Sequence, residues 1–214
     1  MNKDFQFKQL LRAYRKGIID EATFEQEIAT IESGASANGA GLGGGFTAFG
    51  KTYGCERDAV LDFLDRFGSA EGAAEVALRK WDAISKTDCV RGGIRMIAER
   101  EGYHARVFER RLRELGGAKK ADGSDVARQL EYYADPNLSD AEKLLRATSL
   151  GGSDPKKFLQ PIFDFAESIK EDPMTKEIAS LYAKDELASA TWVYEACGLL
   201  NGKGAQPSAS AAAA

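Results

Sequence analysis

The chain has 214 residues, of which 43% are hydrophobic, and this is enough apolar material for one domain with a core of its own. Its 29 Lys and Arg against 33 Asp and Glu give a formal charge of −4, which disfavours nucleic acid and anionic membrane surfaces as partners. Residues 1–17 lack the apolar core of a signal peptide and no later run is long enough to cross a membrane, so we expect a cytoplasmic protein.

Residues 1–33 contain two short amphipathic segments that are separated by Gly17. Apolar residues recur at helical spacing on both sides of this glycine, at Phe7, Leu10, Leu11, Tyr14, Phe24, Ile28 and Ile31. The stretch resembles the SHOCT-type helical hairpins found at the ends of many bacterial proteins, and the resemblance implies self-association or docking to a partner. A helical hairpin without a special role is the alternative.

Residues 34–54 are rich in glycine and predict a flexible linker. From Gly45 to Thr52 the letters also satisfy the pattern G-x-x-x-x-G-K-[ST] of a phosphate-binding loop, in which glycine amides and a lysine surround phosphates. Such a loop follows a buried parallel strand and opens a helix, whereas this stretch follows a run of glycines. We therefore interpret it as part of the linker and not as a nucleotide site.

Residues 55–200 predict a series of helices, and none of their segments shows the alternation typical of a strand. The predicted fold class is therefore all-α. Aspartate–proline pairs at Asp154 and Asp172 and a capping box at Ser139 mark three of the helix starts. The predicted helices cover about 55–81, 88–115, 124–134, 139–148, 155–169 and 173–200. Residues 201–214 offer nothing to a core and predict a disordered tail.

Two of these helices carry apolar stripes that are interrupted by ionisable side chains. On the first, Glu71 falls on the same face as Val60, Leu64, Phe67, Ala74, Leu78 and Trp81. On the second, Glu101 and His104 fall on the face of Ile94, Ile97, Phe108 and Leu112. Buried carboxylates are normally paired or bound to a metal. A Glu-x-x-His pair on one helix, facing a glutamate of the next helix, is typical of carboxylate-bridged metal sites in helix bundles.

On these residues the chain resembles the ferritin-like, rubrerythrin-like superfamily. The resemblance is carried by Glu71 in "SAEGAAEVALRKW" and by Glu101 and His104 in "RMIAEREGYHARVFERRLRELGG", and it is loose beyond residue 117. It implies a ferritin-like four-helix bundle over 55–200, with extra short helices in its crossover. It also implies bound iron, as a di-iron or mononuclear site or with manganese instead, and oxygen or peroxide chemistry.

The second half of the bundle lacks most of the ligands that this superfamily repeats. The last predicted helix carries its apolar stripe at Ile178, Leu181, Ala188 and Trp192. On that alignment Asp185 and Ala188 stand where a second Glu and His are needed, and a shift by one residue gives Glu186 and Ser189 instead. Either alignment leaves the second histidine missing, since His104 is the only histidine of the chain.

Three arrangements follow from this depleted second half. In the first, a homodimer or higher homo-oligomer completes a di-iron site with Glu71, Glu101 and His104 from two copies of the chain. In the second, the same three residues hold a single metal ion inside one chain, together with Asp185 or Glu186. In the third, the protein is a metal-free scaffold or interaction protein, and the buried polar groups hydrogen-bond one another.

Overall fold

The computed structural model of the chain describes residues 45–150 and 154–202, together with Leu11, Tyr14, Glu21, Phe24, Glu25, Ile28 and Ala29. These seven N-terminal residues are helical, and the rings of Tyr14 and Phe24 stack with centroids 4.6 Å apart. Most of the predicted hairpin over 1–33, the first part of the predicted linker and the predicted tail beyond residue 202 lie outside the described residues. The chain divides into two compact units, and the second unit begins at Phe46.

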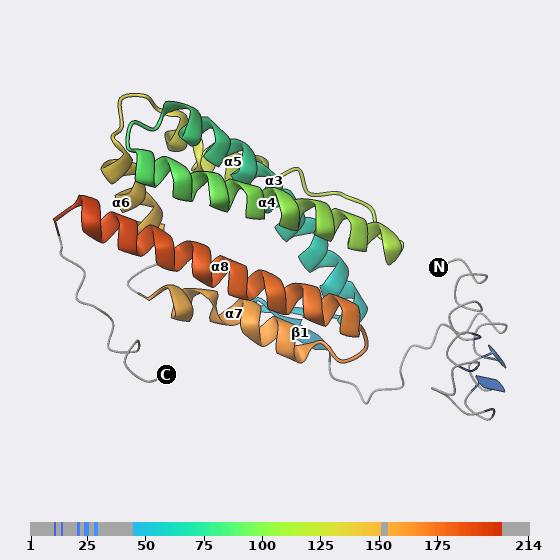
Figure 1. Cartoon of the computed structure of the whole chain (residues 1–214). Coiled ribbons are helices and arrows are strands. Elements are labelled where there is room, and N and C mark those ends of the chain that lie inside the picture. The colour runs from blue at the N-terminus through green and yellow to red at the C-terminus, as the bar shows by residue number, and fades with distance from the viewer. Residues whose placement is uncertain are drawn as a thin grey trace. The chain divides into compact units, whose positions relative to one another are not determined.

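The described part of the second unit is mostly helical, which confirms the all-α prediction (Figure 1). Helices α3 and α4 form one antiparallel hairpin, helices α7 and α8 form another, and the short helices lie between them in the chain. None of the helices in the described ranges is both long enough and apolar enough to cross a membrane. The elements are α3 (Glu56–Ile84), α4 (Asp88–Glu114), α5 (Ser124–Gln129), the 3₁₀ helix η1 (Glu131–Ala134), α6 (Asp140–Leu150), α7 (Pro155–Ser168) and α8 (Pro173–Leu200).

The helix starts that the sequence marked are confirmed by their capping hydrogen bonds. Asp154 accepts from the backbone amides of the second and third residues after it, and Asp172 accepts from the amide of Thr175. Both aspartates are followed by a proline at the first helical position. At the start of α6, the backbone amide of Ser139 donates to Glu142 at 2.8 Å, as a capping box requires.

A small β-hairpin precedes α3. Strand β1 (Phe46–Ala48) pairs in antiparallel fashion with β2 (Lys51–Tyr53). The two residues between the strands, Phe49 and Gly50, have φ angles of 51° and 73°, as a tight type I′ turn requires. The side chain of Tyr53 is buried, and its hydroxyl donates to Asp62 on α3 at 2.6 Å. These contacts attach the hairpin to the core.

The prediction of a linker over 34–54 is therefore wrong for its last part. Three-residue strands are too short to show alternation, and the aromatic residues that fix them to the core lie in a glycine-rich stretch. The phosphate-loop pattern forms this antiparallel hairpin and not the strand–loop–helix unit that surrounds phosphates. Its lysine, Lys51, lies 3.5 Å from the carboxylate of Asp62, with which it forms an exposed ion pair.

Glycines allow α3 and α4 to approach each other closely around their midpoints. A Cβ atom at Gly68 would lie 3.0 Å from the Cβ of Phe108, and a Cβ at Gly102 would lie 2.4 Å from the carboxyl carbon of Glu75. Larger residues at these positions would therefore force the two helices apart or displace the facing side chain. The close approach brings the polar residues at the middle of both helices within contact distance.

Asp140, the first residue of α6, ties that helix to the loop between α3 and α4. Its carboxylate accepts from the indole of Trp81 at 2.7 Å, from the hydroxyl of Ser85 at 3.0 Å and from the backbone amide of Thr87 at 3.1 Å. Burial raises the pKa of Asp140, but these hydrogen bonds outweigh it and hold the pKa below its usual range. The ionised carboxylate of Asp140 thus has a structural role, since it connects α6 to the end of α3 and to the loop that follows.

We expect the substitution Asp140→Ala to lower the free energy of unfolding by about 3 kcal/mol, because it removes three hydrogen bonds to a charged group and leaves the buried indole N–H of Trp81 without an acceptor. Urea unfolding followed by circular dichroism measures this loss. Asp125→Ala is the matched control, since that side chain is exposed on α5 and should change stability by less than about 0.5 kcal/mol. Equal midpoints for the two variants would contradict the anchoring role.

Candidate metal centre

The apolar stripes of α3 and α4 bury the three ionisable residues that the sequence singled out. Glu71 is 5% exposed, Glu101 is 6% exposed and His104 is 2% exposed. Their neighbours on the stripes are buried as well, including Val60, Leu64, Leu78, Trp81, Ile94, Ile97, Phe108 and Leu112. The prediction that carboxylates and the imidazole face the interior is therefore confirmed.

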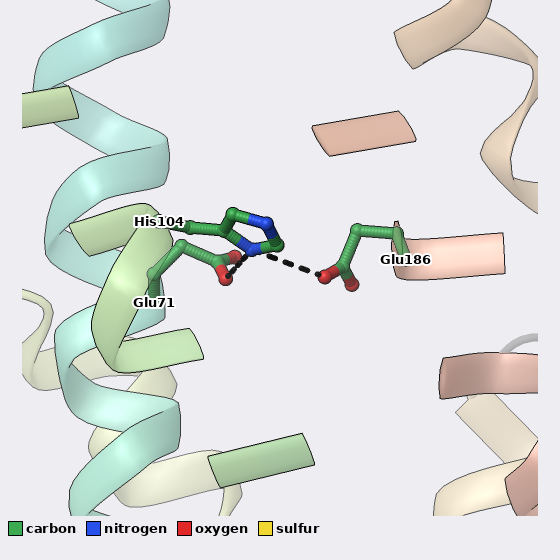
Figure 2. Close-up of side chains that lie close together, drawn as sticks. All are labelled: Glu71, His104 and Glu186. Atoms are coloured by element: carbon green, nitrogen blue, oxygen red, sulfur yellow. Dashed lines mark ion pairs between the residues drawn. The ribbon is translucent and has the colours of Figure 1, made fainter. Parts of the chain in front are cut away.

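Three side chains from three helices meet at one point in the interior. His104 Nδ1 lies 3.5 Å from Glu71 Oε2 and 3.8 Å from Glu186 Oε1. Figure 2 shows the two carboxylates pointing toward the His104 ring. One ligand atom of each residue lies within 4.8 Å of the other two. All three of these atoms, Glu71 Oε2, His104 Nδ1 and Glu186 Oε1, are buried and have no hydrogen-bond partner. We call these three residues the ligand cluster.

The other ring nitrogen of His104 is fixed by Asp185. Nε2 lies 3.1 Å from Asp185 Oδ2, and a carboxylate at this distance accepts a hydrogen from the ring. In the neutral imidazole this leaves the lone pair on Nδ1, the atom that faces Glu71 and Glu186. A histidine that binds a metal through one nitrogen almost always donates its other N–H to such a carboxylate or carbonyl.

Helix α8 contributes two acidic residues, and its inward face differs from the predicted one. Leu181 is 46% exposed and Ala188 is exposed, so the stripe assigned to them is wrong. The buried positions of α8 are Thr175, Ala179, Tyr182, Ala183, Ser189 and Cys197. Glu186 therefore faces the interior, as the alignment shifted by one residue requires, and Asp185 reaches His104 from the edge of that face.

Tyr182 is part of the site, and the sequence interpretation missed it. Its hydroxyl donates to Glu71 Oε1 at 2.8 Å, and its ring lies edge-on to His104 with centroids 5.0 Å apart. Tyr182 precedes Glu186 by one helical turn, so the correct phase of α8 would have identified it. The hydrogen bond orients Glu71 so that its second oxygen points at His104.

Glu101 supports the ligand cluster without belonging to it. Its side chain interacts with the carboxyl group of Glu71, and this interaction lowers the pKa of Glu71 and raises that of Glu101. The sequence predicted Glu101 as a ligand beside Glu71 and His104, whereas the structure brings Glu186 to the meeting point in its place.

Burial dominates the electrostatics of the acidic residues at this site. It raises the pKa of Glu71 to about 8, with a further rise from the charge of Glu186 and with hydrogen bonds from Glu101 and Tyr182 acting in the opposite direction. Burial also raises the pKa of Glu101 well above its usual range, reinforced by the charge of Glu71. The pKa of Glu186 rises in the same way, through burial and then through the charges of Glu101 and Asp185. Without a cation, the raised pKa of Glu71 therefore holds this group largely in its protonated form near neutral pH.

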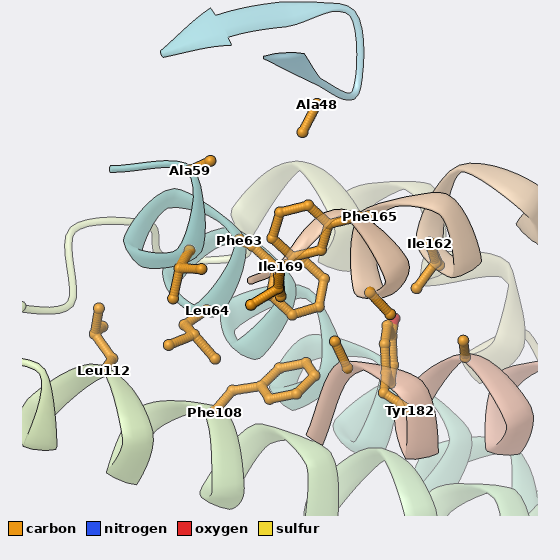
Figure 3. Packing of buried hydrophobic residues seen from close by; sticks show 14 of the residues in the cluster. Ala48, Ala59, Phe63, Leu64, Phe108, Leu112, Ile162, Phe165, Ile169 and Tyr182 are labelled. Carbon is orange, nitrogen blue, oxygen red and sulfur yellow. The ribbon is translucent and has the colours of Figure 1, made fainter. Parts of the chain in front are cut away.

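The ligand cluster lies between two separate apolar cores. In one core the β-hairpin packs against both helical hairpins, around Phe63, Phe108, Phe165 and Tyr182 (Figure 3). The other core surrounds Trp81 and Ile94 near the loop between α3 and α4. The ligand cluster thus has apolar side chains on both sides, and this low-dielectric surrounding strengthens electrostatic interactions within it.

The donor set suits a hard divalent cation. Two carboxylate oxygens and one imidazole nitrogen are typical ligands of iron, manganese and zinc, whereas no cysteine of the described residues takes part. Metal–ligand bonds of about 2.0–2.2 Å put the ligand atoms of one ion roughly 3 to 4.4 Å apart. The two distances from His104 Nδ1, 3.5 Å and 3.8 Å, fall within that range.

The comparisons with known proteins identify no relative: no family model matches the chain, and neither a curated protein nor a solved structure is significantly similar to it.

Proposed function

We propose that this protein binds iron in a ferritin-like four-helix bundle made by α3, α4, α7 and α8, and that Glu71, His104 and Glu186 hold the ion within one chain. One observation carries the proposal: three buried atoms with lone pairs meet at one point, and none of them has a hydrogen-bond partner. Leaving such atoms unpaired costs about 1–3 kcal/mol each. A bound cation would satisfy all three at once.

The surrounding residues support this role. Asp185 orients the His104 ring, Tyr182 orients Glu71, and burial together with the charge of Glu71 raises the pKa of Glu101. Oxygen-rich sites with one imidazole bind iron or manganese readily. When bound, iron would supply one-electron redox chemistry toward oxygen or peroxide. The chain itself would surround the ion with the apolar side chains of its two cores and would take up or release protons at Glu71 and Glu101.

The test is metal content together with oligomeric mass, measured on protein from iron- and manganese-replete cells and again after anaerobic titration with ferrous iron. One ion per chain in a monomer supports the proposal, whereas one ion per chain in a homodimer would favour the di-iron site that two copies of the chain complete. Two ions per chain would replace the single site by a di-iron site that includes Glu101. A metal-free protein that also fails to take up ferrous iron would overturn the proposal and favour a scaffold or interaction protein.

Asp185 should act as a positioning residue for His104. We expect Asp185→Asn to weaken ferrous-iron affinity by about 10- to 100-fold, because an amide holds the imidazole N–H less firmly than a carboxylate does. Competition with a chelator of known affinity measures the change. Asp164→Asn on α7 is the control, since that residue hydrogen-bonds Gln160 away from the site. A loss of secondary structure in Asp185→Asn, with unchanged affinity per folded molecule, would show a purely structural role.

A further inference from the structure

A large apolar pocket adjoins the ligand cluster. It has a volume of about 430 Å³ and is lined by residues of both helical hairpins and of the segment between them. Pockets that enclose small-molecule ligands measure about 300–1,000 Å³, whereas close-packed interiors contain few voids larger than a water molecule. Most of its wall is apolar, and its largest side chains include Leu78, Trp81, Ile94, Ile97, Leu130 and Trp192.

The acidic groups of the pocket lie together on one part of its wall. Glu71, Glu101 and Glu186 all line it, so the pocket reaches the ligand cluster directly. Ser189 lies one turn beyond Glu186 and lines the pocket as well. Its hydroxyl oxygen accepts from Arg100 at 3.2 Å, which leaves the hydroxyl proton available to a bound molecule.

We propose that this pocket binds an elongated, uncharged apolar molecule with a single oxygen-bearing end, and that this end lies against the ligand cluster. The apolar wall takes the hydrocarbon part, because its burial is favourable by about 25 cal/mol per Å². The choice of an uncharged end follows from the cost of burial: a hydroxyl group can exchange hydrogen bonds with the three acidic side chains and with Ser189, which line this part of the wall. An anionic head group such as a fatty-acid carboxylate would lose its hydration in this apolar pocket, which costs far more than burying a hydroxyl group.

The opening of the pocket is consistent with such an occupant. Phe158 and Pro155 of α7 line the pocket, and Phe158 is 57% exposed. A large aromatic side chain that is exposed and also lines an apolar pocket gives the hydrocarbon of an entering molecule an apolar surface to contact. The proposal assigns a substrate class to the metal site and in that respect rests on the proposed function.

The probe is a series of straight-chain primary alcohols from hexan-1-ol to dodecan-1-ol, with decanoate as the charged counterpart. Titration calorimetry on chelator-treated protein at pH 8 should show affinity that rises with chain length. Decan-1-ol should bind at least about tenfold more tightly than decanoate, which is a free-energy difference of about 1.4 kcal/mol or more. No binding of any alcohol, or tighter binding of decanoate, would overturn the proposal.

Two variants fill the pocket from different helices, so that misfolding of one leaves the test intact. Ala190→Phe and Ala74→Phe both place a ring in the pocket and should abolish decan-1-ol binding while their circular dichroism stays native. Ala188→Phe is the matched control on α8, because residue 188 is exposed and does not line the pocket. Retained binding in both folded filling variants would overturn the proposal.

Manganese loading tests where the head group lies. Paramagnetic Mn²⁺ in the ligand cluster should broaden the NMR signal of the CH₂ next to the hydroxyl more than that of the terminal methyl. The reverse order would overturn the assigned orientation. Alcohol binding by a protein that takes up no metal would support the pocket and refute the proposed function. Metal uptake without alcohol binding would refute the pocket alone.

Discussion

Glu71→Gln should abolish high-affinity metal binding and at the same time stabilise the metal-free protein. The variant removes a ligand oxygen, so ferrous-iron affinity should fall by at least about 100-fold, more than for an orienting residue. Its amide also supplies N–H donors where Glu71 Oε2, His104 Nδ1 and Glu186 Oε1 now face one another without partners. Glu71 takes up a proton on folding, because its pKa is about 8 in the folded protein against 4.5 for the free side chain. The Glu71→Gln variant avoids this cost, so its free energy of unfolding at pH 7 should be higher by up to about 3 kcal/mol.

The measurement is urea unfolding of chelator-treated wild type and variant, with and without added ferrous iron. Glu75→Gln is the matched control: it makes the same chemical change one turn further along α3, where the side chain forms an ion pair with Arg79. That control should leave metal affinity unchanged and lower stability by less than about 1 kcal/mol. A metal-free Glu71→Gln protein that is less stable than wild type would mean that the ligand cluster is a satisfied network.

The parts of the site that could be predicted from sequence are those on α3 and α4. Both helices are long, and each has one apolar face broken only by Glu71 or by Glu101 and His104, so their phase is unambiguous. Helix α8 offers no such contrast. Apolar residues surround it, and several of them, including Met174 and Leu181, face solvent. The apolar stripe predicted through Leu181 and Ala188 therefore lies one residue away from the buried face, which contains Tyr182 and Ser189.

Other misses have equally local causes. On α7, Leu159, Ile162 and Phe165 are buried, whereas Phe158, one turn before Ile162, is 57% exposed, so helical spacing alone does not identify the buried face. The β-hairpin is fixed by tertiary contacts, notably the hydrogen bond from Tyr53 to Asp62, which lies nine residues away. The meeting of Glu186 with His104 depends on how α8 packs against α4, and periodicity within one helix carries no information on that packing.

The metal-free protein should lose stability as the pH rises from about 4.5 to 8. Glu71 has a raised pKa in the folded state, so the folded protein binds more protons than the unfolded chain throughout this window, and its stability falls with increasing pH. The rise of this pKa from 4.5 to about 8 on folding corresponds to a loss of at most about 5 kcal/mol in the free energy of unfolding across this pH window. Glu101 and Glu186 act in the same direction, whereas the carboxylates with lowered pKa, such as Asp140, lose their contribution only at more acidic pH.

Bound metal should reverse this pH dependence. The ion replaces the protons, so its affinity should rise by up to about tenfold per pH unit for each proton released, until pH 8. Unfolding midpoints at pH 5, 6, 7 and 8, with and without ferrous iron under nitrogen, would then diverge as the pH increases. Glu71→Gln separates the contribution of Glu71 from those of Glu101 and Glu186, because it should reduce the slope of stability against pH in the metal-free protein and remove the divergence on adding iron. Parallel curves for wild type with and without iron would mean that the buried carboxyl groups keep their protons and that no cation displaces them.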